Sequence, residues 1–290
     1  MKRLLVCICL LLTHLLPAHS VHAATIHPTF QGLVHRLYKD GMDLEYLTSV
    51  FSRPELGLLP EIVAKGLVRR EARLNYAQFL EDYAVKKAIS YLEAHKSILM
   101  EVEGRFGVSA PVVVAILCVE TACGTYIGRY TTFNLLITQA LSIEPDIYRE
   151  IYRLIPTEEK RGLTQQTVKK RQKRKSRKAY HELKALLNYT RDHGIDPFSI
   201  QGSAEGAIGI PQFLPSNITV YGYDGDGNGT IDLFQHRDAI ASVASFLKAF
   251  RWREDNSYKK KKQIIRRYNP SDYYADTVLA LADKLKDSWP

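Results

Sequence analysis

The sequence predicts a mainly α-helical protein, and three observations lead to that prediction. Apolar residues recur at helical spacing in most segments, for example at Val243, Phe246 and Leu247. Alternating strand patterns are scarce throughout the chain. The chain has 290 residues, of which 46% are hydrophobic, so it can bury a sizeable core. After the N-terminus, no segment is apolar for long enough to span a membrane.

The N-terminal residues 1–23 differ from the rest of the chain. A basic start is followed by an apolar run from Leu4 to Leu16 and by small residues that end at Ala23. This pattern is typical of a secretory signal peptide cleaved after Ala23, which predicts a periplasmic protein. An uncleaved anchor is the alternative, although the run is short for one. We interpret residues 24–290 as one domain.

The segments before residue 108 are predicted to be helical. Helical spacing indicates one helix around Leu33–Leu37 and a second over Leu44–Phe51, with Asp43 as its cap. A long amphipathic helix is predicted from Tyr76 to Arg105, and Gly104–Gly107 is its expected stop.

The next predicted helix carries a single carboxylate near its end. Ser109 suits its N-cap and Gly124 its stop. Glu120 follows eight apolar residues, Val112–Val119, and lies in the expected last turn. An apolar wall and the negative end of the helix dipole both raise the pKa of a carboxyl, and a Glu kept protonated near neutral pH can act as a general acid. Alternatively, Glu120 is a rim carboxylate paired with Arg129.

Two cysteines remain after cleavage, Cys118 and Cys123. Along an unbroken helix, five residues rise by about 7.5 Å, which exceeds the limit of roughly 7 Å on Cα separation in a disulfide. Two buried, free thiols are then expected. If the helix ends at Thr121, a disulfide beside Glu120 becomes possible, and an exported protein would permit it.

The net charge of +9 is concentrated in basic runs. Lys169–Lys178 carries eight basic side chains in ten residues, and Lys259–Lys262 adds four. We interpret residues 141–193 as a variable, basic, helical subregion of the domain. Its basic run either faces an anionic polymer or membrane, or is a solvated helix face. The export signal and the lack of a nucleic-acid motif argue against a nucleic-acid partner.

The remaining segments alternate loops and helices. We expect a Gly-rich turn over Ile200–Pro215, an acidic loop over Tyr221–Asp238 and a helix over Asp238–Trp252. The chain then ends in two helices separated by a break at Asn269–Pro270, because a proline disfavours the helical conformation of the residue before it.

Three separated segments resemble one family. They are VETACGTYIG with the N-x-L that follows it, GSAEGAIGIPQFLPS, and RYNPSDYYADTVLALA. They are similar to the catalytic-helix segment, the S-x-x-G-A-x-G-x-x-Q-F-x-P-S pattern and the Y-N-x-S-x-x-Y-x-x-x-V pattern of the membrane-bound lytic murein transglycosylase B family. The resemblance extends from about Phe79 to Leu285. It implies a lysozyme-like helical catalytic domain that cuts the glycan strands of peptidoglycan.

The resemblance also implies a reaction. The bond between N-acetylmuramic acid (MurNAc) and N-acetylglucosamine (GlcNAc) is cleaved, and a 1,6-anhydro-MurNAc end forms without water. Glu120 matches the family's acid/base position. It would protonate the glycosidic oxygen and then accept a proton from the C6 hydroxyl that attacks C1. Because the substrate supplies its own nucleophile, one carboxylate suffices, whereas an ordinary glycosidase needs two.

Further residues match substrate-contacting positions of the family. Ser203 matches a serine near the N-acetyl group, and Asn269 an asparagine proposed to steady the cationic intermediate. Amides and hydroxyls can bond sugar hydroxyls, and aromatic faces can cover apolar sugar faces. Alternatively, Gln212 caps a helix and the aromatic residues belong to the core. The expected substrate-binding residues are Ser203, Gln212, Phe213, Tyr268, Asn269 and Tyr274.

The acidic loop contains DGDGNGTID, which matches the start of an EF-hand calcium loop. The last position of that loop is Gln235, a weaker ligand than the usual Glu, and the resemblance suggests a longer loop that closes at Asp238. We expect a structural Ca²⁺ and no catalytic cofactor; a polar turn without metal is the alternative. The predicted ligands are Asp224, Asp226, Asn228, Thr230, Asp232 and Asp238.

The chain departs from the family pattern at three places. Glu205 replaces an alanine, and Phe246 stands where some members have a substrate-contacting tyrosine. A basic pair that some members carry after the catalytic helix is absent near Pro145. We therefore hypothesise that the Lys169–Lys178 run binds the anionic parts of the substrate instead.

The leading function is that of a periplasmic lytic transglycosylase, with peptidoglycan glycan strands as its partner. One alternative is a hydrolytic muramidase, in which Glu205 directs a water molecule. Others are a non-catalytic peptidoglycan-binding protein and a calcium-stabilised helical adaptor without a glycan site. Proteins of cell-wall synthesis or secretion are further possible partners.

Overall fold

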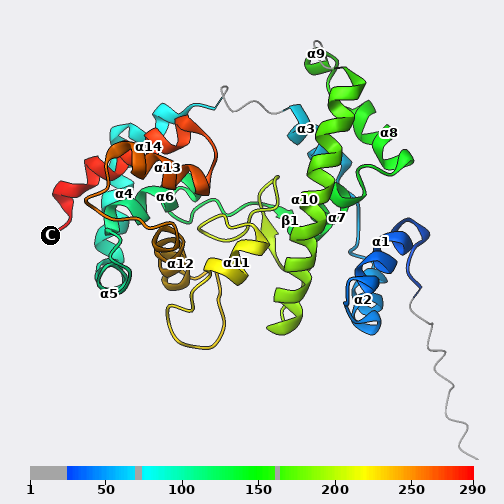
Figure 1. The fold of residues 1–290 in the computed structure, drawn as a ribbon, viewed down its shortest axis with the longest axis horizontal. Helices are drawn as coiled ribbons and strands as arrows, with labels where there is room; N and C mark the ends of the chain where they lie inside the picture. Colours follow the sequence, from blue (N-terminus) through cyan, green and yellow to red (C-terminus); the bar gives the residue numbers. More distant parts are fainter. Residues whose placement is uncertain (1–24, 69–73, 161–163) are drawn as a thin grey trace, which may run out of the picture. The chain divides into compact units, whose positions relative to one another are not determined.

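Helices dominate the structure, a computed structural model that describes residues 25–68, 74–160 and 164–290 (Figure 1). This confirms the mainly α prediction, because the sheet in these residues consists of two very short strands. The chain divides into two compact units, Met1–Arg53 and Pro54–Pro290. The predicted signal peptide, residues 1–23, lies outside the described residues, and the interpretation of residues 24–290 as one domain stays a prediction.

The first unit contains two helices, α1 (Pro28–Lys39) and α2 (Leu44–Phe51), which pack against each other. Both agree with the helical spacing in the sequence. Asp43 caps α2, since its Oδ1 accepts a hydrogen bond of 2.7 Å from the Tyr46 N–H.

The second unit begins with helices that are shorter than predicted. They are α3 (Pro60–Val68), the 3₁₀-helix η2 (Tyr76–Leu80), α4 (Asp82–Ala94) and α5 (Lys96–Phe106). The prediction of one helix over Tyr76–Arg105 is wrong, because the backbone leaves the helical conformation at Glu81 and His95. The break lets α4 pack on α6 and α14 while α5 packs on α12. Gly107 ends α5 in the left-handed conformation, within the predicted stop.

Helix α6 (Ala110–Thr121) forms the centre of this unit. Every residue in it is buried except Glu120. It packs against α4, α5, α12 and α14, so a nearly continuous apolar sequence is accommodated on all its faces.

The basic subregion is built around one long helix. After β1 (Tyr130–Thr131) come α7 (Thr132–Leu141), α8 (Pro145–Leu154), α9 (Thr157–Lys160) and α10 (Gln165–Asp192). Figure 1 shows α10 lying along α7, against which it packs. The predicted surface helix therefore also has a buried face, which includes Gln172, Ser176 and Leu183.

The last third of the chain contains α12 and α14, which pack against α6. Its elements are β2 (Gln201–Gly202), α11 (Pro215–Tyr221), α12 (His236–Ala249), α13 (Tyr258–Tyr268), α14 (Asp272–Leu285) and the 3₁₀-helix η3 (Lys286–Ser288). β2 pairs with β1 in antiparallel orientation. The predicted break between α13 and α14 is confirmed, and the Ser271 Oγ caps α14 by accepting from the Tyr274 N–H.

Candidate membrane spans are limited to one pair of helices. No single helix in the described ranges is both long and apolar enough to cross a membrane. Taken together, the bent pair α5 and α6 is long and apolar enough, by length and composition alone.

Candidate active site

Glu120 is the penultimate residue of α6 and is half-buried, between Val119 and Thr121, which are 8% and 1% exposed. The start of the helix is anchored as well, because the Ser109 N–H donates to Glu254 Oε1 at 3.2 Å. Since both neighbours of Glu120 and the rest of the helix are packed in the core, its carboxylate projects from a rigid element.

The turn after Glu120 is sharper than predicted. The expected stop at Gly124 is two residues too late, because Ala122 and Cys123 already adopt left-handed conformations, with φ of 48° and 60°. This conformation is costly for residues with a side chain. The Cys118–Cys123 disulfide closes the same turn, with a Cα separation of 4.0 Å. The bridge proposed for a helix that ends at Thr121 is therefore present, and it holds the end of α6.

Hydrogen bonds tie this helix end to two later segments. The Thr121 hydroxyl donates to the Ile210 carbonyl at 2.9 Å. The Ile210 N–H in turn donates to the Leu233 carbonyl at 2.9 Å. The residue next to Glu120 is thus connected through the Gly-rich turn to the acidic loop.

The Gly-rich turn between β2 and α11 positions Ser203 and Gln212. The Ser203 Oγ accepts from the Ala207 N–H at 3.2 Å. The Gln212 amide nitrogen donates to the carbonyls of Ile127 (3.1 Å) and Gly209 (2.9 Å). These bonds fix the orientation of the Gln212 amide and leave its Oε1 without a partner among the described residues.

The break between α13 and α14 positions three more side chains. The rings of Tyr268 and Tyr274 stack with centroids 6.5 Å apart, and the Tyr268 hydroxyl donates to the Pro211 carbonyl. Burial raises the pKa of both phenols well above the usual value, and the negative charge of Glu120 raises it further. The Asn269 side chain has no hydrogen-bond partner in the described part of the chain. Both tyrosines therefore lie close enough to Glu120 to feel its charge.

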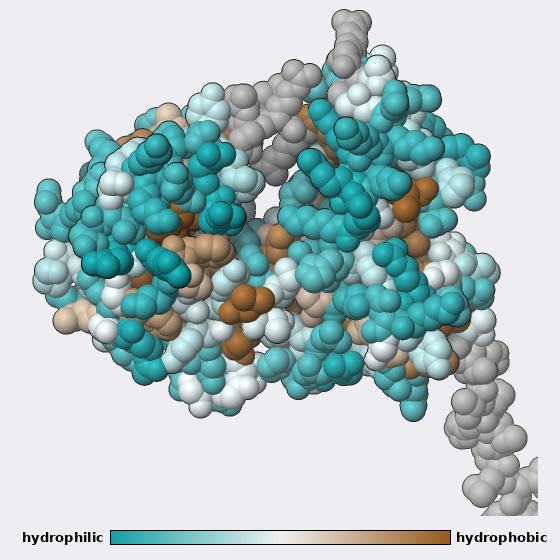
Figure 2. Space-filling view, viewed as in Figure 1, coloured by the Kyte–Doolittle hydropathy of each residue, from teal (hydrophilic) through white to brown (hydrophobic). Residues whose placement is uncertain are grey.

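These side chains line one cleft of about 1430 Å³ within the second unit. Figure 2 shows a hollow between the side that carries α13 and α14 and the hydrophilic surface of α10. The volume exceeds the roughly 300–1,000 Å³ of typical small-molecule pockets, so it suits an oligomeric ligand. The lining includes six of the predicted site residues: Glu120, Ser203, Gln212, Tyr268, Asn269 and Tyr274.

Phe213, the remaining predicted substrate contact, lies beneath the cleft instead of in its lining. Its side chain is 1% exposed, and its ring is 5.7 Å from that of Tyr268. Phe246, which is 2% exposed, packs edge-on against the same tyrosine at 4.9 Å. Both phenylalanines belong to the core, as the alternative interpretation held for the aromatic residues, and they support Tyr268 from behind.

Glu205 lines the cleft but is already paired. The Lys175 Nζ lies 3.0 Å and 2.8 Å from its two carboxylate oxygens and also donates to the Gly66 carbonyl at 3.1 Å. The sequence left open whether Glu205 enters the cleft or points to solvent. The structure places it at the cleft in an ion pair.

Sequence reasoning missed several polar residues of the lining, among them Tyr76 and Gln139. The Tyr76 ring meets that of Tyr274 edge-on at 6.5 Å. The sequence predicts Tyr76 at the start of a long amphipathic helix, and Gln139 lies within an apolar helix, α7. Neither belongs to a motif that could have identified it.

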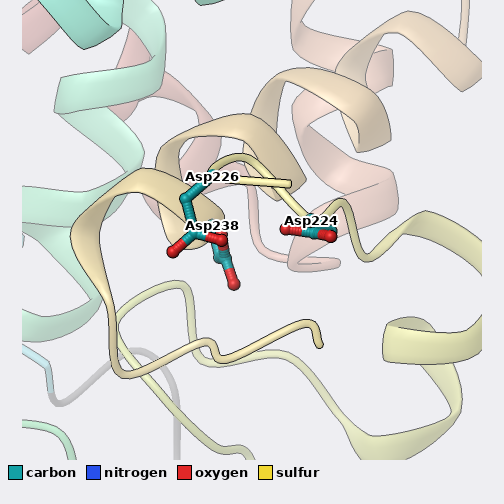
Figure 3. Close-up of side chains that lie close together, drawn as sticks. All are labelled: Asp224, Asp226 and Asp238. Atoms are coloured by element: carbon teal, nitrogen blue, oxygen red, sulfur yellow. The ribbon is translucent and has the colours of Figure 1, made fainter. Parts of the chain in front are cut away.

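The acidic loop brings together three of the predicted metal ligands. Asp224, Asp226 and Asp238 each present a carboxylate oxygen within 4.8 Å of the others (Figure 3). Asp238 is buried and accepts from the N–H groups of Gly225 (2.9 Å) and Asp232 (2.7 Å). Burial raises the pKa of Asp238, and the charges of Asp226 and Asp224 add to the effect. Three carboxylates at this spacing fit a hard cation such as Ca²⁺.

The other predicted ligands serve the loop's own turns. The Asn228 Oδ1 accepts from the Thr230 N–H at 2.8 Å. Asp232 lies outside the group of three carboxylates, and its Oδ1 accepts from the Phe234 N–H at 2.9 Å.

Comparison with known proteins identifies the family. Residues 25–263 match the family model described as the transglycosylase SLT domain. The chain belongs to this family. It is 26% identical over 238 residues to membrane-bound lytic murein transglycosylase B of Escherichia coli K12, an alignment that covers 78% of this chain and 58% of that protein. The chain thus spans little more than half the length of this relative.

Solved structures agree on the fold. The Escherichia coli lytic transglycosylase Slt35 in complex with calcium superposes with a TM-score of 0.71 at 21% identity, covering 89% of this chain and 92% of that one. Pseudomonas aeruginosa SltB3 in complex with NAG-anhNAM-pentapeptide gives 0.70 at 21% identity, with 91% and 83% covered. The helical architecture of this transglycosylase SLT domain is therefore shared with both.

Proposed function

We propose that this chain is a peptidoglycan lytic transglycosylase that cleaves the MurNAc–GlcNAc bond and forms 1,6-anhydro-MurNAc. The observation that carries the proposal is Glu120, a carboxylate held on a rigid helix end in a cleft of about 1430 Å³. Family membership supports it, as does the saccharide bound in the structure of SltB3. An export signal over residues 1–23 would deliver the protein to the periplasm, where this substrate lies.

Glu120 acts first as acid and then as base. Its carboxyl donates a proton to the glycosidic oxygen as the bond to C1 breaks. The resulting carboxylate accepts the C6 hydroxyl proton as that oxygen attacks C1, so the proton is returned to the enzyme and no water is consumed. Because one group performs both transfers, it needs a position from which it can reach both oxygens, and the bridged turn after α6 provides such a fixed position.

The other lining residues orient the sugar and its charge. Asn269, with an unbonded amide, presents its carbonyl dipole to the developing cation, and Ser203 contacts the N-acetyl group. Gln212 offers its free Oε1 to a sugar hydroxyl. The Tyr268 ring covers an apolar sugar face, and the Tyr274 ring, which is only 2% exposed, stacks on it and helps to shield Glu120 from water.

The acidic loop holds a structural Ca²⁺ through Asp224, Asp226 and Asp238, with Asn228, Thr230 and Asp232 as additional ligands of the EF-hand pattern. The calcium complex of Slt35 supports this assignment. When bound, the ion would offset two of the three negative charges. The loop then fixes Leu233, which bonds to Ile210 and through it to the end of α6.

A hydrolytic muramidase is the second candidate, because Glu205 supplies a second carboxylate in the cleft. Its ion pair with Lys175 engages both oxygens, which disfavours Glu205 as the base that activates a water molecule.

Incubation of purified sacculi with the wild type and with Glu120→Gln tests the enzyme proposal against a binding protein. We expect the wild type to release soluble muropeptides and the variant to bind sacculi equally well without releasing any. A wild type that binds but never solubilises sacculi would leave only the non-catalytic alternative.

A further inference from the structure

The basic run Lys169–Lys178 lies within α10, and the helical conformation distributes its side chains over two faces. Its eight cationic residues are four that line the cleft, Arg171, Arg174, Lys175 and Lys178, and four that do not, Lys169, Lys170, Lys173 and Arg177. The first four occupy positions i, i+3, i+4 and i+7, and so lie on one side of the helix. We call them the cationic face of α10.

The orientation of this face is fixed by packing on the other side of the helix. Val168, Gln172 and Ser176 are buried, and the Ser176 hydroxyl donates to the Ala140 carbonyl in α7 at 2.6 Å. Because α10 packs along α7, it cannot rotate without exposing these residues. The cationic face is therefore held towards the cleft.

Two of its four cations are partly used by the protein. The Arg171 guanidinium donates to the Leu67 carbonyl at 3.2 Å, and Lys175 pairs with Glu205. Arg174 and Lys178 are exposed and make no hydrogen bond or ion pair with any described residue. Near them, Glu182 is also occupied, since it accepts from the Ser216 N–H and hydroxyl at 2.9 Å and 3.0 Å. Arg174 and Lys178 thus leave positive charge on a cleft wall that nothing in the described protein neutralises.

We infer that the cationic face binds carboxylates of the peptide stems that branch from the glycan, and so makes the enzyme prefer peptide-bearing strands. This inference rests on the proposed function, which places the glycan beside Glu120. A peptide stem that is not cross-linked carries a terminal carboxylate, and guanidinium and ammonium groups form charge-assisted hydrogen bonds with carboxylates. Glu120 and the cationic face of α10 line the same cleft of about 1430 Å³, so a strand held at Glu120 can extend its peptides towards α10.

The sequence offers a matched pair of variants for the test. Arg174→Gln with Lys178→Gln removes one Arg and one Lys, four residues apart, from the cationic face. Lys173→Gln with Arg177→Gln removes the same charges, at the same spacing, from residues outside the cleft lining. None of these four residues bonds to a described residue, so we expect both double variants to fold.

Binding is measured in the Glu120→Gln background, so that no substrate is consumed, on two probes: soluble peptide-bearing glycan strands and the same strands stripped of peptides by an amidase. We expect the Arg174/Lys178 variant to lose about tenfold in affinity for peptide-bearing strands and far less for stripped strands. The Lys173/Arg177 variant should bind both probes as the parent does. High salt should reduce the preference for peptide-bearing strands in the parent.

Several outcomes would overturn the inference. Equal losses in the two double variants would mean that the whole run acts as an unspecific polyanion surface. Equal losses on both probes would place the contacts on the glycan, and unchanged affinity would leave the face without a role in binding. These results are separate from the proposed function, which fails if the protein with Glu120 intact cuts neither kind of strand or leaves reducing ends instead of anhydro ends.

Discussion

Glu120 and the acidic loop place the same chemical group in opposite surroundings. Glu120 stands at the end of a buried apolar helix, beside two stacked tyrosines. Asp224, Asp226 and Asp238 crowd within 4.8 Å of one another and accept backbone N–H bonds. A single carboxyl in apolar surroundings can gain and lose a proton during a reaction, whereas a cluster of three suits a permanent cation. The first site should therefore control turnover, and the second should control stability.

The largest expected effect is that of Glu120→Gln on turnover. The variant keeps the shape of the side chain but can neither donate nor accept the proton, so we expect the rate on sacculi to fall at least about 10³-fold. Its melting temperature should stay close to that of the wild type, because Glu120 is half-buried at a cleft. Differential scanning fluorimetry and a muropeptide-release assay measure the two quantities on one preparation. A large loss of stability would contradict the separation of the two sites.

The acidic loop should show the converse behaviour. Ca²⁺ at about 100 times its dissociation constant should stabilise the wild type by about 2.7 kcal/mol, which is several degrees in melting temperature. Asp226→Asn removes one of the three carboxylates and should abolish most of this shift. Asp255→Asn, an exposed carboxylate paired with Arg253 on another loop, is the control and should leave the shift intact. A wild type whose melting temperature ignores Ca²⁺ and its chelation by EGTA would refute the metal site.

The disulfide closes the turn at the end of α6, from which hydrogen bonds lead through Ile210 to the acidic loop. Replacing both Cys118 and Cys123 by Ala removes a short covalent loop, for which chain entropy predicts a loss of about 2 kcal/mol. The left-handed conformation of Ala122 then depends on hydrogen bonds alone, so turnover should fall as well. Urea denaturation gives the change in stability, and kcat on soluble strands gives the catalytic effect. If stability falls while kcat holds, the turn is only a structural staple and does not position Glu120.

The smallest expected effect is a dependence of stability on pH. It must be known before the pH profile of turnover can be assigned to Glu120. The His95 and His236 rings pack at a tilt with centroids 4.4 Å apart, and the His236 Nδ1 bonds to the Tyr91 hydroxyl at 2.8 Å. Burial lowers the pKa of both imidazoles, and the charge of His236 lowers that of His95 further. The unfolded chain therefore binds more protons than the folded one as pH falls through about 6.5, so stability should decrease towards acidic pH.

Melting curves of the wild type and His95→Gln between about pH 8 and 5 check this expectation, and the variant should show the weaker dependence. A dependence of equal size in both proteins would assign it to other groups. The pH profile of turnover should then be recorded below the melting temperature at each pH, so that it reports Glu120 and not unfolding.

Local patterns predicted the features that depend on local chemistry. The eight apolar residues before Glu120 specified a buried helix, and Pro270 marked the break that positions Asn269. The spacing of the acidic loop indicated the three clustered aspartates. In each case, neighbouring residues determine the conformation.

Features that depend on distant residues were not predictable. The apolar stripe continues across His95, so the break between α4 and α5 arises from their different packing partners. The pairing of Glu205 with Lys175 joins residues 30 positions apart, and nothing local marks either one. Phe213 belongs to the motif that predicted substrate contacts, yet its ring is buried in the core. Motif membership alone does not tell which side chains of a motif face the ligand.

The central claim is that one carboxylate suffices because the substrate supplies its own nucleophile. Mass spectrometry of the products formed from peptidoglycan in ¹⁸O-labelled water tests it most directly. We predict that the wild type produces 1,6-anhydro-MurNAc ends without incorporated label, and that Glu120→Gln produces none. Reducing MurNAc ends that carry ¹⁸O would show that water is the nucleophile, and the account of a lone acid/base carboxylate would be wrong.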